Sequence, residues 1–216
     1  MITLCIPTIR RFDLLKTTVA SAMAGTVKPD RILIMDNSAG DCPKFPGTEV
    51  IVPTANKGVA GSWNYFFENC EDDIIISNDD VEFKSDTIEL LIKAANENPE
   101  KAFLYPYTKA DHDNTFSVFL LRKKIWSEVG PFDEFFFPAY FEDNDYHYRM
   151  KLKGYPELYL APGSEYIHVG SATLQSYNAS DLTHHYYRFS RNQDYYIKKW
   201  GGMPGHETFT VPFNEE

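Results

Sequence analysis

Short apolar runs alternate with helical patterns along the first hundred residues. The runs at residues 2–6, 31–35, 49–52 and 74–76 are almost purely apolar, as in strands covered on both faces of a parallel sheet. Between them, apolar residues recur at the i, i+3, i+4 and i+7 spacing of amphipathic helices. The predicted helices cover residues 12–24, 58–69 and a segment that begins at Ser85 or Asp86 and ends at Pro99. This alternation predicts βαβ units and a mainly parallel sheet.

The pattern changes after residue 100. Strands are predicted at residues 102–107, 116–121, 157–160 and 166–168, and helices at residues 123–129, 143–153 and 180–200. The segment from Gly201 onward is rich in glycine and proline and is predicted to be a loosely held tail.

Composition narrows the class of protein. Of 216 residues, 43% are hydrophobic and 24% charged, which is enough to bury a sizeable core. The net charge of −10 argues against general nucleic-acid binding, although a bound cation would still allow a phosphorylated ligand. Three cysteines without a CxxC pair, and no apolar run long enough to span a bilayer, predict a soluble, cytoplasmic protein with reduced thiols.

Polar residues follow three of the predicted strands. The first strand ends in Pro7-Thr8-Ile9-Arg10, the second in Asp36-Asn37-Ser38 and the fourth in Asn78-Asp79-Asp80. Each segment alone is explained by a turn or a helix cap, but together they would lie at the sheet edge where open α/β sheets bind ligands. Two adjacent carboxylates can bind Mg²⁺ or Mn²⁺, and a solvated acidic turn is the alternative.

A second acidic group lies beside an aromatic stretch. Residues 135–140 read Phe-Phe-Phe-Pro-Ala-Tyr, and the group Glu142-Asp143-Asn144-Asp145 follows. A carboxylate among aromatic rings is partly desolvated, which raises its pKa toward values that suit a general base. Core aromatics beside an acidic helix start are the structural alternative. His168 alone is more often structural, but beside a carboxylate site it becomes a candidate ligand.

The order of these segments resembles the GT-A-fold glycosyltransferases, specifically the inverting enzymes of family 2. The resemblance runs from Ile2 to about Thr173. The matching pieces are Ile6-Pro7-Thr8-Ile9-Arg10, Ile34-Met35-Asp36-Asn37-Ser38, Asn56-Lys57-Gly58-Val59-Ala60-Gly61-Ser62-Trp63-Asn64, Ser77-Asn78-Asp79-Asp80-Val81, Gly130-Pro131-Phe132-Asp133-Glu134, Glu142-Asp143-Asn144-Asp145 and His168.

The resemblance implies a single α/β domain of the GT-A, Rossmann-like type, with a central, mainly parallel sheet flanked by helices. Residues 1–100 would form its nucleotide-sugar-binding half and residues 101–200 its acceptor-binding and catalytic half, followed by the tail at 201–216.

The resemblance also implies a role for each matched residue. Contacts with the nucleotide sugar would come from Pro7, Thr8, Arg10, Asp36, Asn56, Lys57, Gly58, Asn78 and Asp79. Asn78-Asp79-Asp80 takes the place of the DxD motif, with Asn in its first position, and Asp80 and His168 would bind Mn²⁺ or Mg²⁺. Of the pair Glu142-Asp143, Asp143 would be the general base that activates an acceptor hydroxyl for a single displacement with inversion.

The implied activity is therefore that of a metal-dependent hexosyltransferase. The donor would be a nucleotide diphosphate sugar, a uridine diphosphate sugar first of all, and the acceptor a glycan, glycolipid or glycoprotein. Three alternatives stay open. They are a sugar nucleotidyltransferase, a non-catalytic nucleotide- or sugar-binding domain suggested by Asn78, and an α/β domain of unrelated function. The compact chain would also suit a module of a larger enzyme, a viral one included.

Overall fold

The computed structural model describes residues 1–109, 115–168 and 179–215, so residues 169–173 at the end of the family resemblance lie outside it. The N-terminal half contains β1 (Thr3–Thr8), α1 (Phe12–Ala24), β2 (Arg31–Asp36), β3 (Thr48–Ile51), α2 (Gly58–Asn69), β4 (Ile74–Ser77), β5 (Val81–Phe83) and α3 (Thr87–Glu97). The C-terminal half contains β6 (Phe103–Tyr107), β7 (Val118–Leu121), α4 (Lys123–Val129), α5 (Glu142–Leu152), β8 (Leu158–His168), α7 (Ala179–Trp200) and a 3₁₀ turn (Pro212–Asn214).

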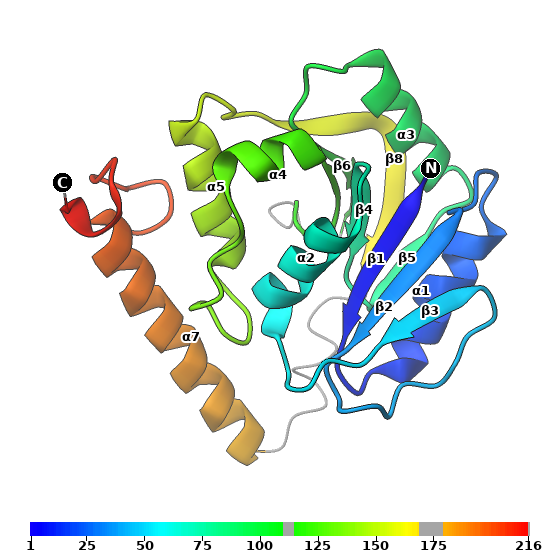
Figure 1. The fold of residues 1–216 in the computed structure, drawn as a ribbon, viewed down its shortest axis with the longest axis horizontal. Helices are drawn as coiled ribbons and strands as arrows, with labels where there is room; N and C mark the ends of the chain where they lie inside the picture. Colours follow the sequence, from blue (N-terminus) through cyan, green and yellow to red (C-terminus); the bar gives the residue numbers. More distant parts are fainter. Residues whose placement is uncertain (110–114, 169–178, 216) are drawn as a thin grey trace.

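The strands form one eight-stranded sheet in the order β3-β2-β1-β4-β7-β6-β8-β5 (Figure 1). Strands β3, β2, β1 and β4 run parallel, as the apolar runs predicted. Strand β7 is antiparallel to both β4 and β6, β6 pairs in parallel with β8, and β5 is antiparallel to β8. The carboxyl ends of β1, β2 and β4 therefore lie at the same edge.

The core lies on both faces of this sheet, because side chains of a strand alternate between its two faces. Leu4 and Ile6 of β1 pack with α1 and α3, while Cys5 between them packs on the opposite side with α2, α4 and α5. Burial of a large apolar side chain such as Phe66 of α2 contributes about 1.5–3 kcal/mol. Strands β1, β2 and β4 are thus buried on both faces, which explains their lack of polar alternation.

Two predictions about strands were wrong. The two short strands predicted at residues 157–160 and 166–168 are one strand, β8, that continues through Pro162 and Gly163. The strand β5 was missed, because three residues are too few to form a recognisable strand pattern. Its pairing with β8 places Val81 opposite His168, which matters for the site below.

The C-terminal tail is not loosely held. Backbone amides of Thr208 and Phe209 donate to the carbonyl oxygen of Trp200, and the Tyr148 hydroxyl donates to the Phe209 carbonyl oxygen at 2.8 Å. Glycine and proline predicted an irregular segment but not the hydrogen bonds that anchor it to α5 and α7.

Helix α7 runs along the outer side of α5, away from the parallel strands (Figure 1). The buried aromatic cluster between this helix and the segment before α5 contains Phe136, Phe141, Tyr196 and Trp200. Among the helices that the structure describes, none combines the length and the apolar character needed to cross a membrane.

Candidate active site

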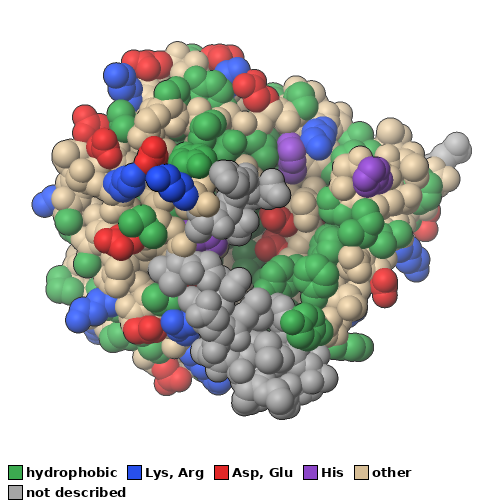
Figure 2. Space-filling model, turned by 180° about the vertical axis from the view of Figure 1, so that it is seen from behind, with side chains coloured by type: hydrophobic (Ala, Val, Ile, Leu, Met, Phe, Trp, Pro, Cys, Tyr) green, Lys and Arg blue, Asp and Glu red, His purple; other side chains and the backbone are tan. Residues whose placement is uncertain are grey.

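A cavity of about 590 Å³ opens at the carboxyl edge of the parallel strands. Figure 2 shows acidic side chains beside a hollow on this face. Of the residues predicted to form the site, the cavity lining contains Pro7, Thr8, Asn56, Gly58, Asn78, Asp79, Asp80, Glu142 and Asp143. The predicted residues outside the lining are Arg10, Asp36, Lys57 and His168. The structure thus brings together the two acidic groups, which are about sixty residues apart in the sequence.

One wall of the cavity is built on the ends of β1 and β4. Strand β1 ends at Thr8, whose hydroxyl donates to Asp79 Oδ2 at 2.5 Å. Asp80 directly precedes β5, so the pairing of β5 with β8 brings it to His168, and His168 Nε2 lies 3.1 Å from Asp80 Oδ1. The backbone amide of Asn78 donates to the Ser117 carbonyl oxygen, which fixes the turn.

The carboxylates of this wall are partly desolvated. Burial raises the pKa of Asp79 to about 7, although the Thr8 hydroxyl works in the opposite direction by donating to its ionised form. His168 is buried, and its Nδ1 finds no hydrogen-bond partner among the residues that the structure describes.

We examined whether these residues fit a divalent cation. A carboxylate and an imidazole 3.1 Å apart are suitable ligands for Mn²⁺, and the unpartnered His168 Nδ1 can carry the proton that leaves Nε2 free to bind. Within the described ranges no group of three or more His, Cys, Asp or Glu side chains could hold a metal. Asp80 and His168 therefore fit a site in which substrate phosphates supply the remaining ligands, as Mg²⁺ sites often do.

The second strand end is organised around Asp36. Its fully buried carboxylate accepts hydrogen bonds from the backbone amides of Ser38, Gly40 and Cys42 and from the Ser38 hydroxyl. Burial opposes the charge of Asp36, but these hydrogen bonds outweigh it and lower its pKa. The carboxylate thus holds the turn after β2. Its predicted contact with a nucleoside stays a prediction, as does that of the exposed Arg10.

The loop before α2 closes another side of the cavity. Asn37 accepts a hydrogen bond from the Lys57 backbone amide at 2.8 Å, and Asn56 accepts one from the Gly58 amide at 2.7 Å. Gly58 has a φ of +65°, and a Cβ atom there would lie 2.7 Å from the Pro138 carbonyl oxygen. Glycine is therefore required by both the backbone angle and the close approach of the aromatic segment.

Glu142 and Asp143, at the start of α5, line another part of the cavity. Glu142 is 6% exposed, and its Oε2 finds no hydrogen-bond partner in the described part of the chain. Asp143 is half-buried, and its Oδ1 accepts a hydrogen bond from the Asn144 amide at 2.8 Å.

The two carboxyl groups differ in how readily they ionise. Burial raises the pKa of Glu142 well above its ordinary value, and the neighbouring charge of Asp143 raises it further. Burial also raises the pKa of Asp143, but the backbone amide of Asn144 stabilises its ionised form. The pKa of Glu142 is thus raised more strongly than that of Asp143.

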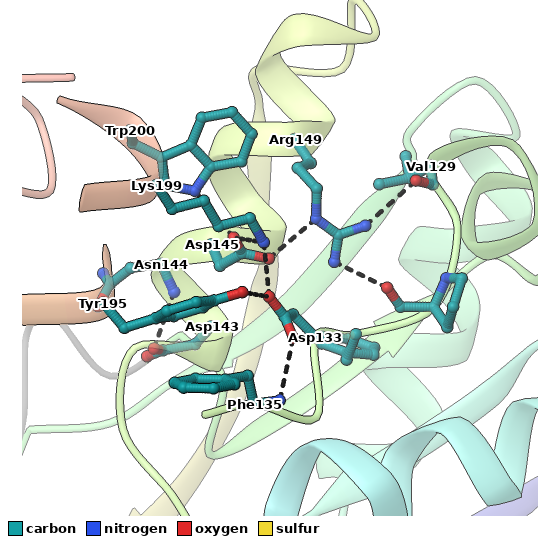
Figure 3. A network of polar contacts seen from close by, with 12 residues as sticks. Val129, Asp133, Phe135, Asp143, Asn144, Asp145, Arg149, Tyr195, Lys199 and Trp200 are labelled. Carbon is teal, nitrogen blue, oxygen red and sulfur yellow. Dashed lines mark hydrogen bonds and ion pairs between the residues drawn. The ribbon is translucent and has the colours of Figure 1, made fainter. Parts of the chain in front are cut away.

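A network of charged side chains links α5 to α7 (Figure 3). Lys199 of α7 lies between Asp133 and Asp145, with its Nζ 2.7 Å and 2.6 Å from their carboxylate oxygens. Asp145 also accepts hydrogen bonds from Arg149 Nε and Trp200 Nε1. Burial opposes the charge of Asp133, but the Lys199 ammonium outweighs it and holds the pKa of Asp133 below its ordinary value. One lysine thus joins Asp133, before the aromatic stretch, to Asp145 in the first turn of α5.

Sequence reasoning missed residues that line the cavity from α7 and the core. Arg188 and Phe189 of α7 reach the cavity, as do Trp63 and Phe116. Phe189 packs against Tyr140 with their ring centroids 5.4 Å apart. The helix was predicted, but the periodicity of a helix does not indicate which distant loop its face meets.

The chain was compared with known proteins. The family model described as Glycosyl transferase family 2 matches residues 3–154. A curated relative, a galactofuranosyl glycosyltransferase of Leishmania donovani, is 39% identical over 64 residues, which make up 30% of this chain and 14% of that protein.

Two solved structures share the fold. The mannosyltransferase PcManGT from Pyrobaculum calidifontis, solved in complex with GDP-Man and Mn²⁺, aligns with a TM-score of 0.65 at 14% identity, over 88% of this chain and 64% of that chain. Staphylococcus aureus TarS 1–349 aligns with a TM-score of 0.59 at 11% identity, over 79% and 60%. The present chain thus spans less than two thirds of these proteins. Likeness at such identity shows the fold, and it confirms the predicted GT-A α/β domain.

Proposed function

The chain belongs to glycosyl transferase family 2, and we propose that it transfers a glycosyl group from a nucleoside diphosphate sugar to an acceptor hydroxyl. The observation that carries this proposal is the arrangement of the cavity. The Asp79-Asp80 turn and the Glu142-Asp143 pair, far apart in the sequence, both line one cavity of about 590 Å³. A phosphate-binding group and a base in the same cavity suit a direct displacement at a sugar carbon.

The wall formed by β1 and β4 would bind the donor. Asp80 and His168 would hold a divalent cation, which would neutralise charge on the departing diphosphate. The hydrogen bond from Thr8 holds the Asp79 carboxyl in place beside that position. PcManGT, which shares the fold, was solved in complex with GDP-Man and Mn²⁺, which supports a nucleotide sugar and a divalent cation as ligands here.

The Glu142-Asp143 pair would activate the acceptor. Asp143, the more easily ionised of the pair, would take the proton of an acceptor hydroxyl as its oxygen attacks the anomeric carbon. The new carbon–oxygen bond forms as the bond to the diphosphate oxygen breaks on the other face, so the configuration inverts. The raised pKa of Glu142 favours its protonated form, which would donate a hydrogen bond in the same cavity. General base catalysis of this kind contributes about 10²–10⁴-fold.

Nucleotide binding is the first test. We would titrate the protein with uridine diphosphate and guanosine diphosphate by calorimetry, with and without Mn²⁺, and repeat the titration with Asp80→Ala. The proposal expects binding that needs both Mn²⁺ and Asp80. Binding of neither nucleotide under any condition would contradict it and would favour a non-catalytic domain.

Turnover is the second test. Uridine and guanosine diphosphate sugars would be screened for transfer to glycosides and for slow transfer to water, with the anomeric configuration of the product read by NMR. Asp143→Asn should bind the nucleotide normally but lose about 10²–10⁴-fold in turnover. Formation of an activated sugar with release of pyrophosphate from a nucleoside triphosphate would instead identify a nucleotidyltransferase.

A further inference from the structure

A strained turn directly precedes the Glu142-Asp143 pair. Tyr140 and Phe141 have φ angles of +82° and +73°, in the left-handed region that residues with a Cβ atom rarely adopt. Each such residue costs roughly 1–2 kcal/mol. Two in succession persist only where the surrounding structure holds them, and such turns gather at functional sites. This turn determines the direction in which α5 starts and hence where its first two carboxyl groups lie.

The turn is held by one side chain of α7. Asn192 is fully buried, and its Nδ2 donates to the carbonyl oxygens of Ala139 at 2.9 Å and Tyr140 at 3.2 Å. Its Oδ1 accepts hydrogen bonds from the guanidinium of Arg191. Because a guanidinium only donates, these contacts fix which end of the amide faces the turn.

Arg191, the residue before Asn192, binds the residues that precede the turn. Its Nη2 donates to the Phe137 carbonyl oxygen at 2.6 Å and to the Phe135 carbonyl oxygen at 3.2 Å. Two adjacent residues of α7 therefore satisfy four carbonyl oxygens of the aromatic segment.

The segment held in this way contacts both α2 and α5. The Pro138 carbonyl oxygen accepts a hydrogen bond from the Val59 amide at the start of α2, at 2.8 Å. The Phe141 carbonyl oxygen accepts one from the Asp145 amide in the first turn of α5, at 2.9 Å. A shift of the turn would therefore displace the Glu142-Asp143 pair relative to α2.

We propose that Asn192 is a positioning residue, which holds the Tyr140-Phe141 turn and thereby directs Glu142 and Asp143 into the cavity. The catalytic part of this inference rests on the proposed function. The structural part does not, because it concerns only the turn and its two neighbouring helices. An amide is required at this position, since an aspartate of the same shape has no N–H group and turns a charge toward two carbonyl oxygens.

The test uses Asn192→Asp and, as a matched control, Asp194→Asn at an exposed position of the same helix. Amide hydrogen exchange at Val59 and Asp145 should speed up about tenfold or more in Asn192→Asp, as expected when a local contact opens, while exchange in α1 stays unchanged. The control should behave as the wild type does. Unchanged exchange at both amides would overturn the proposal. Asn192→Ser serves as a second variant if the aspartate prevents folding.

The kinetic readout separates positioning from a general loss of structure. With the donor identified by the screen above, Asn192→Asp should lower kcat about tenfold or more, because misplaced catalytic groups lose rate steeply, while the KM for the donor stays the same. A donor KM that rises while kcat is unchanged would overturn the catalytic role. If the wild-type protein transfers no sugar, the proposed function fails, and hydrogen exchange alone decides whether Asn192 holds the turn.

Discussion

Glu142 should destabilise the protein increasingly as the pH rises. Its side chain is 6% exposed and its Oε2 finds no hydrogen-bond partner in the part of the chain that the structure describes. Burial and the neighbouring Asp143 raise its pKa well above the ordinary value. We expect Glu142→Gln, which has nearly the same shape but no titrating proton, to remove this dependence on pH.

The sign follows from proton binding in the two states. The unfolded chain releases the Glu142 proton near pH 4.3, whereas the folded protein retains it to a higher pH. Between these two values the folded state binds more protons, so the free energy of unfolding falls as the pH rises. For one proton the slope approaches about 1.4 kcal/mol per pH unit between these two pKa values.

Urea unfolding from pH 5 to 8 measures this difference. Relative to wild type, Glu142→Gln should become steadily more stable as the pH rises. Only the wild type loses free energy of unfolding by keeping Glu142 protonated above the pKa of the unfolded chain. Glu68→Gln, at an exposed position of α2, is the control and should follow the wild type. If the profiles of wild type and Glu142→Gln run parallel over this range, Glu142 titrates as it does in the unfolded chain, and the reasoning about its burial fails.

Two further changes test other parts of the site by denaturant unfolding. Lys199→Met should cost about 3–5 kcal/mol, because it leaves two buried carboxylates without their shared cation, while Lys198→Met at an exposed position should cost little. Gly58→Ala should cost more than Gly154→Ala, since both have positive φ and lose roughly 1–2 kcal/mol, but only Gly58 lies 2.7 Å from a carbonyl oxygen. Equal losses within either pair would contradict the corresponding contact.

The sequence predicted helices and strands correctly wherever hydrophobic periodicity determined the structure. The helices Phe12–Ala24, Gly58–Asn69 and Lys123–Val129 have the predicted bounds, because each has an apolar face and a clear stop. The parallel strands were identified by their continuous apolar runs, and strand ends in such a sheet meet at one edge. The meeting of Thr8 with Asp79 was therefore predictable in outline.

Long-range pairings were not predictable in this way. Strand β5 has three residues and gains its stability from pairing with β8, which nothing in its own sequence indicates. The prediction of two short strands failed because Pro162 and Gly163 usually interrupt a strand, whereas here β8 continues through both. The pairing of β5 with β8 also brings His168 to Asp80, a contact that only the family resemblance implied.

The part of α7 that fixes the site lies outside the segment that identifies the family. The family model ends at residue 154, and Asn192 and Lys199 come after it. These two polar side chains are almost fully buried, and each contacts the segment that carries or precedes the acidic pair. Sequence periodicity marks a polar residue on a helix as solvent-exposed by default, because a buried amide or ammonium needs partners that the helix itself does not supply. The family-matched segment therefore carries the two acidic groups of the cavity, while Asn192 and Lys199 of α7 contact the residues around the Glu142-Asp143 pair. We therefore expect Asn192→Asp to lower turnover at constant nucleotide affinity.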